Sequence, residues 1–177
     1  MADFERAFRK TLENEGGFLL HEVPGDKGGQ TYAGIARKFH PDWSGWKLID
    51  QGITEDVTLT QLVRGFYRQK FWNLIKGDEI EDQSIAEAFY DTVVNMGIVV
   101  GTKAVQSLVG EVQDGVVGPR TLRAINSQRE IWIKASDVFD ERLLAVKVAR
   151  RVGVVRKDRS QIKFIVGWLT RDLKGTS

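Results

Sequence analysis

The strongest constraint on the fold comes from the spacing of apolar residues at the start of the chain. From Phe4 to Leu12 they recur every three or four positions, which predicts an amphipathic helix that begins after an N-cap at Asp3 and runs to Glu15. At about 100° per residue, the side chain of Glu15 lies within about 20° of both Phe4 and Phe8, on the apolar face. The sequence therefore predicts an acidic side chain that points inward at the helix end.

Two glycines follow this glutamate and favour the end of the helix. Gly16 and Gly17 suit a chain that leaves a helix through a left-handed conformation. Glu15 then occupies the last turn, where the negative end of the helix dipole and the apolar neighbours both disfavour an ionised carboxylate. A carboxyl group that keeps its proton can act as a general acid. The alternative is a glutamate that caps the helix or pairs with an arginine across an interface.

A glycine-rich stretch near residues 17–35 supplies a second carboxylate and a hydroxyl group. It is too irregular for a helix and predicts a small irregular or β-hairpin element. A glycosidase needs one protonated carboxyl group and a second group that stabilises positive charge or activates water. Glu15 and Asp26 meet this requirement, and Thr31 is placed to orient a water. Glu22 is an alternative to Asp26.

The rest of the chain predicts a series of helices and no repeat. Two tryptophans, Trp43 and Trp46, lie in a loop where they either close the edge of the core or stack on sugars. A short linker is expected around residues 153–159. In the first part of this region, helices are predicted from Thr58 or Thr60 towards Gly77, from a cap at Ser84 to Gly97, and after Gly101 and Thr102. Three more are predicted towards the C-terminus: one that starts at Pro119, one through Trp132 to Val146, and one from near Ser160 to Leu173.

Composition narrows the possible functions. The 177 residues suffice for one domain with its own core, and the absence of cysteine excludes disulfides and thiolate metal sites. Two histidines, His21 and His40, are too few for a metal site, so we expect neither a metal nor a cofactor. The net charge of +2 is mildly basic, and the late basic residues either bind an anionic polymer such as cell wall or nucleic acid or form a solvated helix face. The solvated face is the favoured interpretation, and we expect no nucleic-acid partner. These residues are Lys147, Arg150, Arg151, Arg156, Lys157 and Arg159.

The chain shows no apolar stretch long enough to cross a bilayer and no basic-then-apolar signal at its start. We therefore expect no integral membrane segment and synthesis in the cytoplasm. An enzyme that acts on the cell wall would then need a holin-type pore or another export route. The oligomeric state is left open by the sequence.

Several motifs in order resemble the glycoside hydrolase family 108 muramidases, also called the secretion activator protein family. The early motifs resemble that family's E-G-G-Y and D-x-G-G-x-T-N-Y-G-I, and the later ones resemble its C-terminal half, a predicted peptidoglycan-binding region. The matching segments are Glu15-Gly16-Gly17-Phe18, residues 26–35, 89–97, 104–106, 114–119 and 167–171.

This resemblance implies a mainly α, lysozyme-like fold in one domain, 1–177. A lobe over residues 1–80 would carry the catalytic motif, and a helical lobe over 81–177 would resemble the peptidoglycan-binding region. It implies Glu15 as the catalytic acid, and the Glu, Asp, Thr order, which is similar to that of phage lysozymes, implies Asp26 and Thr31 as its partners.

The resemblance also implies residues that bind the substrate. Tyr32 stands where the family motif has Asn, and Ala33 stands where it has Tyr, so the usual sugar contacts there are altered. Tyr90 and Asn95 are implied through the family's V-N-x-G segment. An equal alternative is that Asn95 is a helix-terminal residue before Gly97.

The expected activity is hydrolysis of the β-1,4 bond between N-acetylmuramic acid and N-acetylglucosamine in peptidoglycan. One alternative is a lytic transglycosylase that uses Glu15 alone, and another is a non-catalytic peptidoglycan-binding or secretion-associated protein. The expected partner is the peptidoglycan glycan strand. A phage or prophage endolysin that lyses bacteria fits this picture, and so does a bacterial enzyme.

Overall fold

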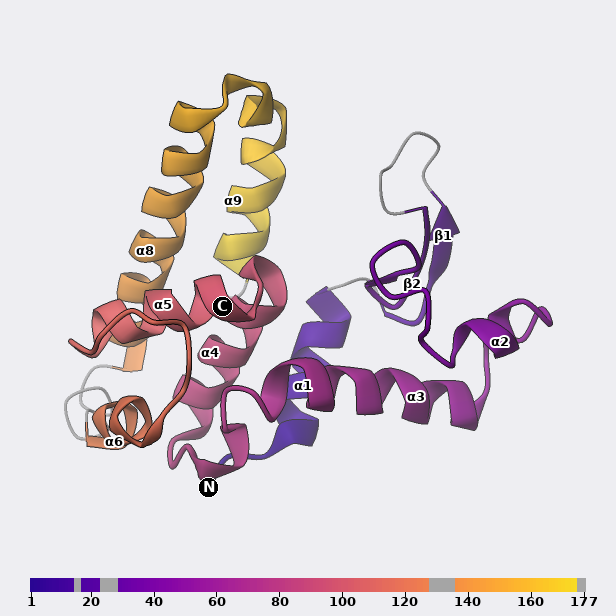
Figure 1. Cartoon of the computed structure of the whole chain (residues 1–177), viewed down its shortest axis with the longest axis horizontal. Helices are drawn as coiled ribbons and strands as arrows, with labels where there is room; N and C mark the ends of the chain where they lie inside the picture. The colour runs from indigo at the N-terminus through magenta and orange to yellow at the C-terminus, as the bar shows by residue number, and fades with distance from the viewer. Residues whose placement is uncertain (15–16, 23–28, 128–135, 175–177) are drawn as a thin grey trace. The chain divides into compact units, whose positions relative to one another are not determined.

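The computed structural model describes residues 1–14, 17–22, 29–127 and 136–174 of the chain (Figure 1). They form two compact units, residues 8–70 and residues 1–7 with 71–177, which are described separately below. Most of the described residues are helical, and one small antiparallel sheet is present. The mainly α architecture with a small β element near residues 17–35 is confirmed.

The first helix, α1 (Phe4–Asn14), forms as its apolar spacing predicts. The backbone N–H of Glu5 donates to the Asp3 carboxylate at 2.7 Å, which confirms Asp3 as the N-terminal cap. Beyond the helix, the N–H of Gly17 donates to the carbonyl of Leu12 at 2.9 Å, and Gly17 has a φ of 77°. This is a glycine-dependent helix exit. Glu15 lies outside the described residues.

The sheet has the order β1-β2-β3 and is antiparallel throughout. β1 (Leu20–Glu22) pairs with β2 (Gln30–Tyr32), so that His21 lies opposite Thr31, and β2 pairs with β3 (Ile35–Ala36). The turn between β2 and β3 places both Ala33 and Gly34 at positive φ, 47° and 77°. After β3 the N–H groups of Phe39 and His40 both donate to the carbonyl of Ala36. A two-residue strand followed by a turn therefore occupies residues 35–40.

Two further helices lie in the described part of the unit of residues 8–70. They are α2 (Trp46–Ile49) and α3 (Val57–Tyr67), and a π-helical turn, η1 (Arg68–Trp72), leads on from α3. The prediction that α3 starts at Thr58 or Thr60 was wrong, because Asp56 caps the helix and accepts from the N–H groups of Thr58 and Leu59.

The two loop tryptophans belong to an aromatic cluster in this unit. Trp46 is buried and donates its indole N–H to the carbonyl of His40 at 2.7 Å. The Trp43 ring meets Trp46 edge-on at 5.1 Å and stacks on Tyr32 at 6.2 Å between centroids. These contacts favour the reading in which the tryptophans close the edge of the core.

The helices of the other unit are η2 (Gly77–Glu79), α4 (Gln83–Met96), α5 (Ile98–Leu108), α6 (Pro119–Ser127), α8 (Ser136–Lys157), η3 (Arg159–Phe164) and α9 (Ile165–Lys174). Pro119 opens α6 as predicted.

Three predicted boundaries in this unit were wrong. Ser84 is not the cap of α4, because Asp82 accepts from the N–H groups of Ser84 and Ile85. α5 begins directly after Gly97 and not after Gly101. The linker expected at 153–159 is wrong, because α8 continues through Gly153 to Lys157.

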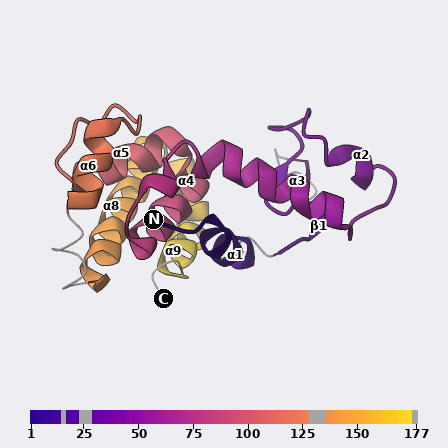
Figure 2. The same ribbon diagram turned by 90° about the horizontal axis from the view of Figure 1, so that it is seen from below.

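The core of this unit is built around α4 and the segment before it. Trp72 is fully buried, donates its indole N–H to the Asp78 carboxylate at 2.8 Å and packs against Phe4 and Tyr90. α5 packs against α4 and α8, and α8 lies beside α9 in both ribbon views (Figure 1, Figure 2). Among the described residues, no helix is long and apolar enough to cross a membrane.

Candidate functional site

The two carboxylates predicted for catalysis, Glu15 and Asp26, lie outside the described residues. Their flanking elements are well defined. α1 ends at Asn14, directly before Glu15, and β1 and β2 flank the segment that contains Asp26. The order of a helix end followed by an antiparallel hairpin is the arrangement that the sequence predicted around these residues.

Of the three predicted catalytic residues, Thr31 is the one that lies within the described residues. It is the middle residue of β2, with His21 opposite it on β1 and Ala36 opposite it on β3. Its hydroxyl group is partly buried and donates to the carbonyl of Gly29 at 3.5 Å. Because this is a long hydrogen bond, the hydroxyl can exchange it for a bond to a water or a sugar.

Tyr32, expected to bind substrate, is buried beside a hollow on the same unit. Its side chain is 1% exposed, and its hydroxyl donates to the carbonyl of Thr54 at 2.7 Å. Burial, with a smaller effect of the Glu55 charge, raises the pKa of its phenol. These contacts favour a packing role for the ring. The hollow, of about 350 Å³, is lined by Phe18, Tyr32, Thr54, Glu55, Asp56, Val57 and Thr60.

Tyr90 and Asn95, the other two predicted binding residues, lie on α4. Tyr90 is fully buried and meets Phe4 edge-on at 6.1 Å, which favours a packing role. The Asn95 amide donates to the carbonyl and the carboxylate of Asp91, one turn earlier, at 2.9 and 3.0 Å. The same carboxylate accepts from the buried ammonium group of Lys147 on α8 at 3.1 Å. Asn95 is thus part of a polar link between α4 and α8.

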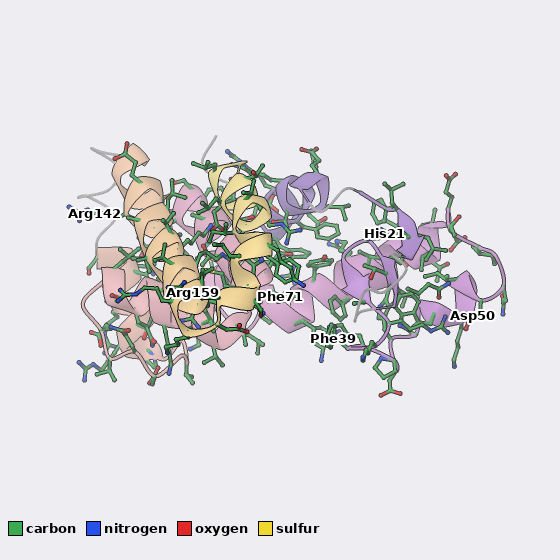
Figure 3. All side chains as sticks on the ribbon, turned by 90° about the horizontal axis from the view of Figure 1, so that it is seen from above. His21, Phe39, Asp50, Phe71, Arg142 and Arg159 are labelled. Atoms are coloured by element: carbon green, nitrogen blue, oxygen red, sulfur yellow. The ribbon has the colours of Figure 1, made fainter. Side chains whose placement is uncertain are left out.

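A second hollow, of about 480 Å³, lies on the unit of residues 8–70 between the turn after β3 and α3. His40 lines it, with its ring edge against Phe66 at 4.7 Å. Burial lowers the pKa of the His40 imidazole, and the Lys70 charge lowers it further. Phe39, labelled in Figure 3, and Trp43 are the other aromatic residues of its wall. Of these residues, sequence reasoning considered only Trp43 for contact with sugars, because the wall joins segments that are distant in the chain.

The sequence also gave no functional weight to Gln106, which organises the loop after α5. This buried side chain donates to Asp114 at 2.7 Å, to the carbonyl of Val116 at 3.0 Å and to Thr121 at 3.2 Å. It accepts from the N–H of Gly115 at 2.9 Å. Hydrogen bonds from Gln106 and from the Val116 N–H lower the pKa of Asp114. A glutamine among the apolar residues of a helix was the available signal.

Within the part of the chain that the structure describes, no group of three or more His, Asp or Glu side chains lies close enough together to hold a metal ion.

Two family models and a solved structure are similar to this chain. A family model described as glycosyl hydrolase 108 matches residues 8–97, and one described as a predicted peptidoglycan domain matches residues 100–173. The fold is similar to the structure of Brucella abortus SagA, with a TM-score of 0.70 and 26% sequence identity, over 98% of this chain and 91% of that one. No curated protein matches the chain in sequence.

These matches confirm the resemblance found in the sequence motifs and support a glycoside hydrolase whose substrate is peptidoglycan. The lysozyme-like, mainly α fold is confirmed with them. Since the first model spans residues 8–97, half of the 177-residue chain, this protein belongs to the glycosyl hydrolase 108 family.

Proposed function

We propose that this protein is a muramidase that hydrolyses the β-1,4 bond between N-acetylmuramic acid and N-acetylglucosamine, with Glu15 as the general acid. The observation that carries the proposal is the end of α1. The buried stripe of this helix runs through Phe8 to Leu12, and the helix ends at Asn14 inside the matched family segment. Glu15 is the next residue along the chain, and the helical period assigns it to the same face.

In this proposal Glu15 donates its proton to the glycosidic oxygen as the bond breaks. Asp26 stabilises the positive charge that develops at the anomeric carbon, or it positions the attacking water together with Thr31. If the two carboxyl groups are about 6.5–9.5 Å apart the reaction inverts the anomeric centre, and at about 5–5.5 Å it retains it. Tyr32 in one unit, and Tyr90 and Asn95 in the other, would then stabilise their own units through the packing described above instead of stacking directly on sugars.

Residues 100–173, matched by the predicted peptidoglycan domain, are proposed to hold the glycan strand. This assignment also favours the second candidate, a protein that binds peptidoglycan without cleaving it. For a wall-degrading enzyme, we propose synthesis in the cytoplasm and passage to the wall through a holin-type pore or another export route.

Product analysis tests the proposed reaction. Purified, lipid-free peptidoglycan is incubated with the protein, and the soluble fragments are identified by mass spectrometry. Hydrolysis predicts fragments that end in reducible N-acetylmuramic acid. Ends in 1,6-anhydro-muramic acid would show a lytic transglycosylase, and sedimentation of the protein with peptidoglycan without any released fragment would show a binding protein.

A further inference from the structure

The turn that joins α8 to α9 carries a concentration of exposed apolar side chains. We call residues 152–166 the hairpin tip. Five large apolar side chains within these fifteen residues are between 37% and 73% exposed. Such a concentration on the surface marks an interaction site more often than a random scatter of apolar residues. The five residues are Val152, Val154, Ile162, Phe164 and Val166.

The hairpin tip is also strongly basic. Four cationic residues stand against one acidic residue, Asp158, which gives the tip a net charge of +3, more than the +2 of the whole chain. The Asp158 carboxylate is used within the fold, because it caps η3 by accepting from the N–H of Ser160 at 2.9 Å. The four cations are Arg156, Lys157, Arg159 and Lys163, all of them exposed.

The base of the hairpin is firmly built, so that the tip is held in place. Arg151 on α8 forms an ion pair at 3.2 Å with Asp172 on α9, which is fully buried. The Arg151 guanidinium group also lies over the Trp168 ring at 5.1 Å from its centroid. η3 packs against both helices, and the Phe164 ring stacks on Trp168 at 5.9 Å. Figure 3 labels Arg159 beside this turn.

We propose that the hairpin tip is a docking surface for an anionic lipid bilayer. The cations would lie among the headgroups, and the aliphatic side chains would enter the boundary of the acyl chains. Nucleic acids and anionic wall polymers also offer negative charge, but they present no continuous apolar phase to Val154, Ile162 and Val166. Single-stranded nucleic acid is bound through aromatic stacking, and the aromatic ring of the tip, Phe164, is already stacked on Trp168. Docking of this kind needs no membrane-spanning helix.

Sedimentation of the full chain with lipid vesicles tests the proposal. Vesicles of phosphatidylglycerol and phosphatidylcholine in equal amounts should sediment the protein, whereas phosphatidylcholine alone should not. Because headgroup attraction is screened by salt, binding should weaken steeply between about 0.05 M and about 0.5 M NaCl. Equal binding to both kinds of vesicle would overturn the proposal.

Two sets of variants with matched controls locate the surface. Each cation near an anionic membrane contributes a factor of about five, so Arg156→Gln, Lys157→Gln and Arg159→Gln together should weaken vesicle binding about 100-fold. The control changes the exposed Lys38, Lys47 and Arg123 to glutamine, which lowers the net charge equally but should weaken binding less than about tenfold.

The second set removes the apolar contribution. Ile162→Gln with Val166→Gln should weaken vesicle binding about tenfold or more without a change in charge. Val57→Gln with Val112→Gln removes apolar side chains of similar exposure outside the tip and should leave binding unchanged. All variants should keep the wild-type circular dichroism spectrum, which shows that they are folded.

The tip proposal is contradicted if tip variants and their controls bind vesicles equally. It is also contradicted if the tip variants keep vesicle binding but lose sedimentation with lipid-free peptidoglycan or with DNA, because the tip would then recognise a polymer. If the wild-type protein releases no fragments from peptidoglycan, the proposed hydrolysis is contradicted. The vesicle result would still stand.

Discussion

A single buried side chain can hold a loop in its conformation, and Gln106 is the clearest case in this fold. Its amide group forms hydrogen bonds with three groups of the loop after α5, from Asp114 to Val116, and with Thr121 on α6. No local pattern in the sequence predicts such partners, because they lie eight to fifteen residues away. The cap at Asp3 and the helix start at Pro119 were predicted, since the effect of each depends only on the next few residues.

Replacement of Gln106 by leucine should lower the free energy of unfolding by about 2–3 kcal/mol, because buried polar groups of the loop lose their partner. Urea denaturation followed by circular dichroism measures the change. Gln51→Leu, an exposed glutamine on the other unit, is the control and should change stability by less than about 0.5 kcal/mol. A similar small change for both variants would show that the loop does not depend on Gln106.

The titration of His40 gives a pH-dependent prediction. Burial, then the Lys70 charge, hold its pKa below the ordinary 6.5, so the unfolded state binds more protons than the folded state between the two values. The His40 contribution to stability is therefore complete above about pH 6.5 and is lost as the pH falls towards its folded pKa. In Lys70→Gln the pKa should rise but stay below 6.5, since burial is the larger cause.

Titration of the His40 ring protons by NMR, with and without the Lys70 substitution, measures this shift. Arg123→Gln, which removes a cation from α6, is the control and should leave the His40 pKa unchanged. A wild-type pKa at or above 6.5 would show that the ring is not desolvated as the structure indicates.

At the scale of elements, the errors in the predicted boundaries have three different physical causes. Asp56 and Asp82 cap α3 and α4 before the positions expected, because one carboxylate oxygen of each accepts from two backbone N–H groups of the first turn. β3 has two residues and exists through its pairing with β2, which no local propensity reveals. α8 continues through Gly153, where sequence reasoning expected a break, because helix packing outweighs the low propensity of glycine.

The crossing of α4 and α5 depends on Gly101. A Cβ atom there would lie 2.8 Å from Cγ1 and 2.9 Å from Cα of Val93, too close for the helices to keep their spacing. Gly101→Ala should therefore destabilise the protein by about 1–3 kcal/mol. Gly65→Ala in α3 is the matched control, since nothing lies within 4 Å of its Cβ position, and it should stabilise by about 0.5–1 kcal/mol. Thermal unfolding of both variants measures the difference, and equal shifts would refute the close crossing.

At the scale of the whole molecule, the fold class and the family followed from the sequence more readily than the site did. Helical period, capping and the order of motifs are local signals, and they predicted the helices around the small sheet. Substrate contacts depend on which side chains remain exposed once distant segments pack. Tyr32 and Tyr90 looked available in the sequence, but the structure buries both. The division of the chain into lobes at residue 80 stays a prediction, as do the catalytic roles of Glu15, Asp26 and Thr31.

The most direct test of the account is the release of reducing ends from purified peptidoglycan by wild type, Glu15→Gln and Glu13→Gln. The first substitution removes the transferable proton with little change of shape, and the second makes the same change on the exposed face of α1. We predict that Glu15→Gln, folded as judged by circular dichroism, loses at least about 100-fold in activity, whereas Glu13→Gln keeps the wild-type rate. A folded Glu15→Gln variant that cleaves as fast as wild type would contradict the assignment of Glu15 as the catalytic acid.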